Sequence, residues 1–289
     1  MQPLVERAIP WASTYGNHDE QYNLSREALF AEEHKYEYSL TQHSPTGVAG
    51  VTNYFLPIFG HDAPDKPAVI LWFFDSRGGH SFQDQRNSTA LPDWVSNSTV
   101  EWFYASKNYL HQKWGDLAPS IAFVHIPPTA FLGSQESLDC AKCTGRNASN
   151  NRPSHHFPGL NEDVPLGSEG NGWQDVPFMQ ALVDTPGLHS VYSGHDHGDS
   201  WCGNWQNTTS VNGISQPHLC FCKQTGYGGY GSWKRGSRVV ELTFDKYNNK
   251  LNVETWVRIE NGVVVQRVSL NATYGEDNYP SCNGEDDSC

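Results

Sequence analysis

The sequence predicts an α/β (α+β) fold: one large domain in which sheets and helices pack in layers. Three observations carry this prediction. Strand-like segments alternate with helical ones through most of the chain, one continuously apolar run is typical of a strand buried on both faces, and a period-two pattern near the C-terminus indicates an antiparallel meander. The chain of 289 residues is long enough to bury the core of such a domain.

Charge and hydropathy exclude nucleic-acid binding and a membrane-spanning helix. The chain has 19 Lys+Arg against 32 Asp+Glu and a formal net charge of −13. It therefore lacks the basic surface that binding to a nucleic-acid backbone requires. The longest apolar run, Ala68 to Phe74, is far shorter than the roughly twenty residues of a membrane-spanning helix, so we expect no membrane span.

The first half of the chain predicts four strands and two helices. Ser25 is a good capping residue for a helix rich in Ala, Leu and Glu, and Pro127 ends the last of the strands because proline lacks the N–H that a ladder needs. In chain order we expect a buried strand over 9–15, a helix over 25–36, strands over 51–59 and 68–74, a helix over 99–114 and a strand over 121–126.

The second half opens with a change of composition. Residues from about 129 to 173 are rich in Gly, Ser, Asn and Pro, which predicts a loop insertion. A helix over 176–183, a strand over 188–192 and a meander over 238–244, 252–259 and 263–270 follow. We therefore expect one domain over 1–270, interrupted by that insertion, and a polar acidic tail over 271–289.

Three polar fragments follow predicted buried strands. They are Gly16-Asn17-His18-Asp19, His125 within Phe123 to Pro127, and His195-Asp196-His197. Imidazole nitrogens bind zinc, iron or manganese, and an amide oxygen suits a harder divalent ion. Ligands gather at the carboxyl ends of strands in open α/β sheets, so we expect these side chains to lie together. Taken singly, each fragment is equally well explained by a turn, a core histidine or a surface loop.

The order of these fragments resembles the calcineurin-like metallophosphoesterases. The flanking sequence, over about Pro3 to Glu260, is similar to the sequences of one subgroup, which contains plant purple-acid-phosphatase-29-like proteins and fungal Dcr-two-type phosphatases. The flanking segments that carry the resemblance are Phe73-Phe74-Asp75-Ser76, Cys202-Gly203 and Gly226-Tyr227-Gly228-Gly229-Tyr230-Gly231. The resemblance implies a four-layer α/β/β/α sandwich with a dinuclear metal site that hydrolyses phosphomonoesters or phosphoproteins.

The resemblance also implies a role for each residue of the motifs. Asn17, His125 and His195 would bind one divalent ion, of Mn, Zn or Fe, and His197 would bind a second. His18 would stabilise the transition state or protonate the leaving oxygen, held in place by Asp19.

Two weaker candidates and one glycine-rich segment complete the predicted site. Arg77 and His80 follow a strand end and are candidates for contact with the anionic part of a phosphorylated substrate, although pairing of a loop arginine with a surface carboxylate explains Arg77 better. The segment 226–231 lacks the G-K-[S/T] ending of a phosphate-binding loop. We expect it to let the backbone turn tightly beside the metal site.

The first two motifs of the family pattern have no counterpart. D-x-H and G-D-x-x-D should precede Gly16, but residues 1–15 hold no Asp and no His. The remaining ligands are all neutral, and two dications without a bridging carboxylate repel each other. We therefore expect an N-terminally truncated domain that binds at most one ion and has impaired activity. The alternatives are a non-catalytic metal- or phosphate-binding descendant and a structural glycoprotein that keeps the fold.

Cysteines and glycosylation sequons favour the secretory pathway or an extracellular location. The chain has seven cysteines, an odd number whose pairing the sequence leaves open. N-x-[S/T] sequons occur at Asn23, Asn87, Asn97, Asn147, Asn207 and Asn271. The first residues contain no signal peptide, so we expect that a leader was lost together with the first motifs.

Overall fold

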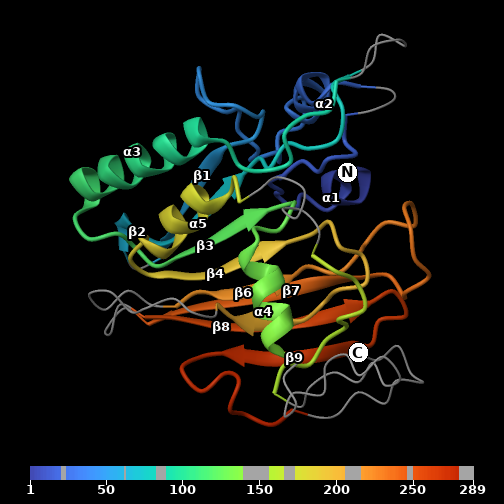
Figure 1. The fold of residues 1–289 in the computed structure, drawn as a ribbon. Helices are drawn as coiled ribbons and strands as arrows, with labels where there is room; N and C mark the ends of the chain where they lie inside the picture. The colour runs from blue at the N-terminus through green and yellow to red at the C-terminus, as the bar shows by residue number, and fades with distance from the viewer. Residues whose placement is uncertain are drawn as a thin grey trace.

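The structure is a computed structural model that describes residues 1–20, 24–61, 63–82, 89–138, 156–165, 173–205, 216–245 and 250–279. Two sheets lie face to face, and helices cover the outer face of the larger sheet (Figure 1). The predicted α/β class is therefore confirmed. The described residues form three of the four predicted layers, in the order helix, sheet, sheet.

The larger sheet has six strands in the order β1-β2-β3-β4-β6-β5. Its central strands β2, β3, β4 and β6 are parallel, and the two outer pairs are antiparallel. The carboxyl ends of the four parallel strands therefore meet at one edge. The strands are β1 (Tyr54–Gly60), β2 (Ala63–Phe74), β3 (Ser120–Val124), β4 (Leu188–Ser193), β5 (Cys202–Asn204) and β6 (His218–Phe221).

The smaller sheet is the predicted antiparallel meander. It consists of β7 (Gly236–Asp245), β8 (Lys250–Ile259) and β9 (Val264–Leu270). Along β8, buried and exposed residues alternate almost strictly, as expected for a strand with one solvent face. The buried residues Leu251 and Val253 pack with Val69 and Ile121 of the larger sheet, so a second hydrophobic cluster fills the space between the sheets.

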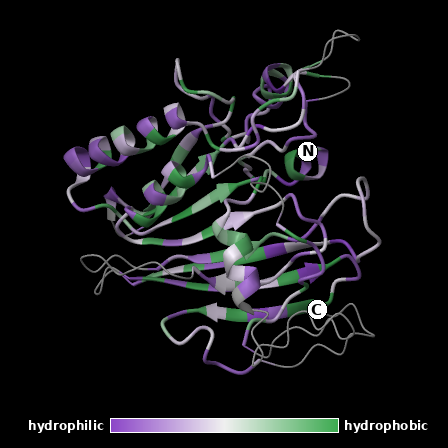
Figure 2. Ribbon diagram, viewed as in Figure 1, coloured by the Kyte–Doolittle hydropathy of each residue, from purple (hydrophilic) through white to green (hydrophobic). Residues whose placement is uncertain are grey.

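Helices α3 (Asn97–Trp114) and α5 (Val176–Val183) lie over the outer face of the larger sheet (Figure 1). Figure 2 shows β3 as hydrophobic and α3 as mixed, the latter in line with a helix that buries one side. The Ser96 hydroxyl caps α3 by accepting the Thr99 N–H. The remaining helices are α1 (Gln2–Glu6), α2 (Arg26–Glu33) and α4 (Ala130–Leu138).

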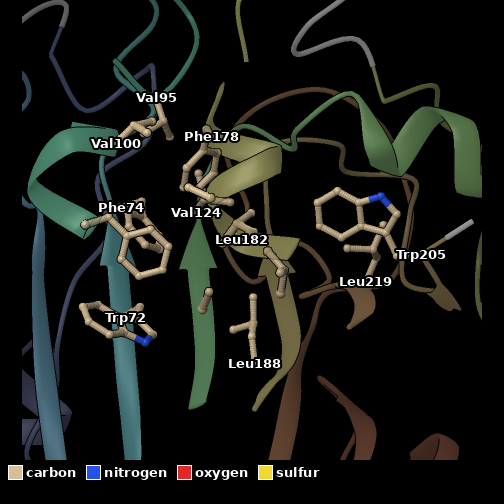
Figure 3. Packing of buried hydrophobic residues seen from close by; sticks show 14 of the residues in the cluster. Trp72, Phe74, Val95, Val100, Val124, Phe178, Leu182, Leu188, Trp205 and Leu219 are labelled. Atoms are coloured by element: carbon tan, nitrogen blue, oxygen red, sulfur yellow. The ribbon is translucent and has the colours of Figure 1, made fainter. Parts of the chain in front are cut away.

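Aromatic side chains dominate the core beneath these helices (Figure 3). Phe74 of β2 is fully buried and meets Phe178 of α5 edge to face, with ring centroids 4.8 Å apart. Trp72 of the same strand meets Phe103 of α3 in the same way at 4.7 Å. Each buried ring contributes about 1.5–3 kcal/mol, and edge-to-face pairing adds roughly 0.5–1.5 kcal/mol.

The prediction of a strand over 9–15 is wrong. The segment makes a single parallel bridge, between Trp11 and Ser39. It is nevertheless extended in part, because the side chains of Trp11, Ser13 and Tyr15 all donate hydrogen bonds to the buried carboxylate of Glu33. Burial opposes ionisation of Glu33, but these donors and Thr41 outweigh it and lower its pKa.

Two further expectations need correction. The segment predicted as a loop insertion begins with helix α4, whose Gln135 accepts a hydrogen bond from the Trp201 indole at 2.8 Å. The predicted acidic tail also begins with packed residues: Tyr274 is buried, and its hydroxyl donates to the Cys202 carbonyl. Residues 280–289, and residues 139–155 and 166–172 of the insertion, lie outside the described residues.

A disulfide joins β5 to β6. Cys202 and Cys220 face each other in the antiparallel ladder and are bonded, while Cys222 is a free thiol whose pKa burial raises to about 11. The other four cysteines lie outside the described residues. Of the helices in the described ranges, none combines the length and the apolar character needed to cross a bilayer.

One partly buried histidine connects the two sheets. His189 of β4 donates from Nε2 to the Leu270 carbonyl of β9 at 3.1 Å, and burial, with a smaller effect of Lys250, lowers its pKa to about 4. Unfolding returns this histidine to a pKa of about 6.5. Protonation therefore favours the unfolded chain, so stability is full above pH 6.5 and falls as the pH drops toward 4.

We expect His189→Gln to flatten this acid-side loss of stability, because one titrating group is removed. Urea unfolding at several pH values should show the slope reduced by up to about 1.4 kcal/mol per pH unit. The control Ser269→Ala changes a neighbour of Leu270 without removing a titrating group and should keep the wild-type slope. An unchanged slope in His189→Gln would contradict the assignment.

Candidate metal centre

The parallel pair β3 and β4 places two histidines side by side. Val124 and Ser193, the last residues of these strands, are paired in register. The pairing continues for one more step, because the His125 carbonyl accepts the Gly194 N–H at 3.1 Å. His195 then adopts a left-handed φ of +69°, which costs about 1–2 kcal/mol for a residue with a Cβ. The two imidazole rings lie 5.4 Å apart at 83°.

Asn17 meets both of these rings. Its side-chain oxygen Oδ1 lies 3.1 Å from His125 Nε2 and 3.1 Å from His195 Nδ1. The close approach depends on Gly16, because a Cβ there would lie 2.7 Å from His125 Nε2. The structure thus brings together three of the predicted metal ligands, from segments far apart in the sequence.

The spacing of Asn17 Oδ1 from each histidine nitrogen fits two ligands that share one metal ion. Ligand atoms that share an ion at about 2.1 Å are separated from one another by roughly 3.0–3.4 Å in octahedral or tetrahedral geometry. The two distances to Asn17 Oδ1 fall in this range. In the described part of the chain, no three His, Cys, Asp or Glu side chains form a metal-binding group, so a three-ligand site at this place would require the Asn17 amide.

Burial keeps both histidines neutral, as a metal ligand must be. Burial lowers the pKa of His125 to about 3, with smaller effects of His195, His18, Arg26 and His197. The pKa of His195 is also lowered, first by burial and then by His18 and His197, while Asp163 and Asp93 oppose the shift. At neutral pH each ring therefore has one nitrogen with a lone pair, and the tautomer decides which.

His197 contacts the glycine-rich segment 226–231. Its Nδ1 lies 2.9 Å from the Tyr230 carbonyl oxygen, and its ring stacks on the Tyr230 ring at 4.1 Å and 12°. Gly229, with a φ of +84°, has no room for a side chain because a Cβ would lie 2.4 Å from His197 Cε1. The expected tight turn beside the site is therefore present. The role of His197 as a second metal ligand stays a prediction.

His18 and Asp19 lie on the loop that carries Asn17. The side chain of His18 is exposed and lies near enough to His125 and His195 to influence their pKa values. The Asp19 carboxylate accepts the Gly16 N–H at 2.6 Å and so shapes the loop. The predicted support of His18 by Asp19, and the catalytic role of both, stay predictions.

The two candidate substrate-binding residues lie nearby. Arg77 donates from Nε and Nη2 to the Trp94 carbonyl, at 3.1 and 2.7 Å, and its guanidinium lies over the Trp94 ring. His80 forms an isolated bridge with Ala90 and exposes its side chain. Arg77 thus has a structural partner, and contact of either residue with substrate stays a prediction.

Sequence reasoning missed Arg26, which ties the loops of the site together. The sequence showed it only as a good helix former, and a single arginine in a first turn has no distinguishing pattern. Its side chain is buried and pairs with Glu20 at 2.9 Å. Nη2 donates to the carbonyls of Gly16 at 3.0 Å, Arg77 at 3.2 Å and Gly78 at 3.0 Å.

We expect Arg26→Lys to destabilise the protein by about 1–3 kcal/mol, because lysine keeps the charge but cannot reach several carbonyls at once. Thermal unfolding measures this loss. Glu27→Gln is the matched control, since Glu27 is the next residue of α2 and its only described partner is the exposed His43. Equal stability of Arg26→Lys and wild type would show that the loops do not depend on Arg26.

Comparison with known proteins finds relatives among phosphatases. The chain is 28% identical to "Probable inactive purple acid phosphatase 14" and 26% identical to "Probable inactive purple acid phosphatase 29", both from Arabidopsis thaliana. It is 27% identical to "Phosphatase DCR2" from Saccharomyces cerevisiae. Each match covers 89% of this chain, and 62%, 63% and 40% of the respective relatives.

The chain therefore spans less than two thirds of the length of these relatives. No family model and no solved structure matches it. The similarity nevertheless extends over most of the chain and includes both groups that the motifs predicted. The chain is similar to purple-acid-phosphatase-like proteins and to the DCR2 phosphatase, which confirms its predicted resemblance to this metallophosphoesterase-like subgroup.

Proposed function

We propose that this chain binds one divalent metal ion through Asn17, His125 and His195 and hydrolyses phosphate esters slowly. The observation that supports this most directly is the convergence of one amide oxygen and two neutral imidazoles at 3.1 Å spacing. The homology to phosphatases indicates the reaction class. The substrate is then a phosphomonoester or a phosphoprotein.

A divalent ion in this position supplies charge stabilisation for a phosphate group and lowers the pKa of a bound water. The residues of the chain supply the rest. His125 and His195 stay neutral because partial burial lowers their pKa values, and Asn17 orients toward both. His18, exposed at the same loop, can donate a proton to the leaving oxygen of the ester.

A second candidate function is metal or phosphate binding without turnover. Two observations favour it. All ligands that converge in the structure are neutral, so a second dication would be poorly compensated. Three plant relatives carry names that include "probable inactive". A structural glycoprotein that keeps the fold is the remaining alternative.

We also propose that the chain matures in the secretory pathway as a glycoprotein. The disulfide between Cys202 and Cys220 supports an oxidising compartment. Among the six sequons, Asn97 and Asn271 fall in the described residues, and both side chains are exposed. The other four sequons lie outside the described residues.

We expect isothermal titration with Mn²⁺ or Zn²⁺ to give no more than one ion per chain. His125→Ala should weaken binding by about 100-fold or more, because it removes one of three ligands. The control His111→Ala changes an exposed histidine of α3, away from the centre, and should bind as the wild type does. Unchanged affinity in His125→Ala would exclude the proposed ion site.

Hydrolysis of p-nitrophenyl phosphate separates the two candidate functions. We expect turnover that EDTA abolishes and that added Mn²⁺ or Zn²⁺ restores, because the ion provides the charge stabilisation. His18→Ala should then lower kcat by about 10²-fold or more. One bound ion without turnover would favour the non-catalytic alternative, and absence of both would contradict the two proposals together.

A further inference from the structure

The segment 226–231 does more than turn beside His197. The Tyr230 carbonyl oxygen lies 2.9 Å from His197 Nδ1. A carbonyl oxygen has no proton to donate, so Nδ1 must carry the hydrogen and Nε2 must carry the lone pair of the neutral ring. Nε2 has no hydrogen-bond partner among the described residues, which leaves that lone pair available.

A network of hydrogen bonds fixes Tyr230 itself. The Tyr230 hydroxyl accepts the His197 backbone N–H at 3.1 Å and donates to the Asp163 carboxylate. The same carboxylate oxygen accepts the Gly198 N–H at 3.3 Å. Partial burial and the bond to Asp163 raise the pKa of Tyr230, so the hydroxyl remains a donor. Tyr230 therefore contacts His197 twice, through its hydroxyl and through its backbone carbonyl.

The stacking of the two rings adds a geometric constraint. Parallel rings at 4.1 Å and 12° restrict rotation of the His197 imidazole about its side-chain bonds. The missing side chain of Gly229 lets the segment approach Cε1 of the same ring. The imidazole is thus enclosed by Tyr230 on one face and by the backbone of Gly229 at its edge.

We propose that Tyr230 is a positioning residue that holds His197 as its Nδ1–H tautomer, so that Nε2 presents the lone pair to the phosphoesterase site. The expected effect of Tyr230 on turnover rests on the proposed phosphoesterase function. The tautomer itself does not depend on turnover or on a bound metal. Free histidine prefers the opposite tautomer in water, so the Nδ1–H form would report the contact with Tyr230.

The test is ¹⁵N NMR of the histidine side chains in the metal-free protein at alkaline pH, with His197 assigned by mutation. We expect His197 to be protonated on Nδ1 in the wild type. Tyr230→Phe keeps the ring and the carbonyl but removes the hydroxyl with both of its bonds, so we expect a mixture of tautomers. Protonation on Nε2 in the wild type would overturn the proposal without any variant.

Tyr227→Phe is the matched control. Tyr227 lies on the same glycine-rich segment and likewise donates its hydroxyl to a carboxylate, that of Glu260 at 2.5 Å, but it is exposed and has no described contact with His197. We expect it to keep the wild-type tautomer. A tautomer that is the same in Tyr230→Phe, Tyr227→Phe and wild type would overturn the role of Tyr230.

Turnover of p-nitrophenyl phosphate in the metal-loaded protein gives the second readout. We expect Tyr230→Phe to lower kcat by about 10-fold relative to Tyr227→Phe, because a side chain that loses its orienting partner no longer holds its lone pair toward the site. A changed tautomer with unchanged kcat would overturn the proposal. If the wild type has no turnover, the proposed phosphoesterase function fails, and the NMR comparison still decides whether Tyr230 orients His197.

Discussion

The parallel pairing of β3 with β4 is the constraint on which the candidate site depends. Because Val124 and Ser193 end these strands in register, His125 and the turn at Gly194 emerge at the same height of the sheet. One further backbone hydrogen bond extends the pair, and His195 accepts an unfavourable left-handed backbone to bring its ring over. A shift of one strand by one residue in this pairing would turn one of the two imidazoles to the other face of the sheet. The two rings thus have fixed positions before any ligand arrives.

The N-terminal loop has to be brought to this edge, and buried polar groups do so. Glu33 collects the side chains of the extended segment 11–15, and Arg26 joins the loop of Gly16 to that of Gly78. Arg26 and Glu33, the first and last residues of α2, are therefore both buried, and their hydrogen bonds are made within the protein. A buried charge that loses its partners costs several kcal/mol, so the same contacts that shape the site also contribute to specifying this arrangement of the chain.

Regular elements and motif residues could be predicted from the sequence, because they leave local patterns. The helix predicted over 176–183 has the observed bounds, the Ser25 cap forms as expected, and Asn17, His125 and His195 converge as the motifs indicated. Residues that act through long-range contacts could not be predicted. Arg26 looked like an ordinary helix residue, and β5 and β6 have only 3 and 4 residues. Helix α4 forms in a Gly- and Ser-containing segment whose Phe131 packs in the main hydrophobic core. The segment 9–15 has a strand-like pattern, but its backbone forms only one bridge, between Trp11 and Ser39, while its side-chain donors bond to the Glu33 carboxylate.

Anomalous diffraction from a crystal grown with Zn²⁺ or Mn²⁺ is the measurement that tests the central claim most directly. The account predicts one anomalous peak per chain, with Asn17 Oδ1, His125 Nε2 and His195 Nδ1 each about 2.0–2.2 Å from the ion. A peak bound by other residues, or no peak at this edge of the sheet at saturating metal concentration, would contradict it.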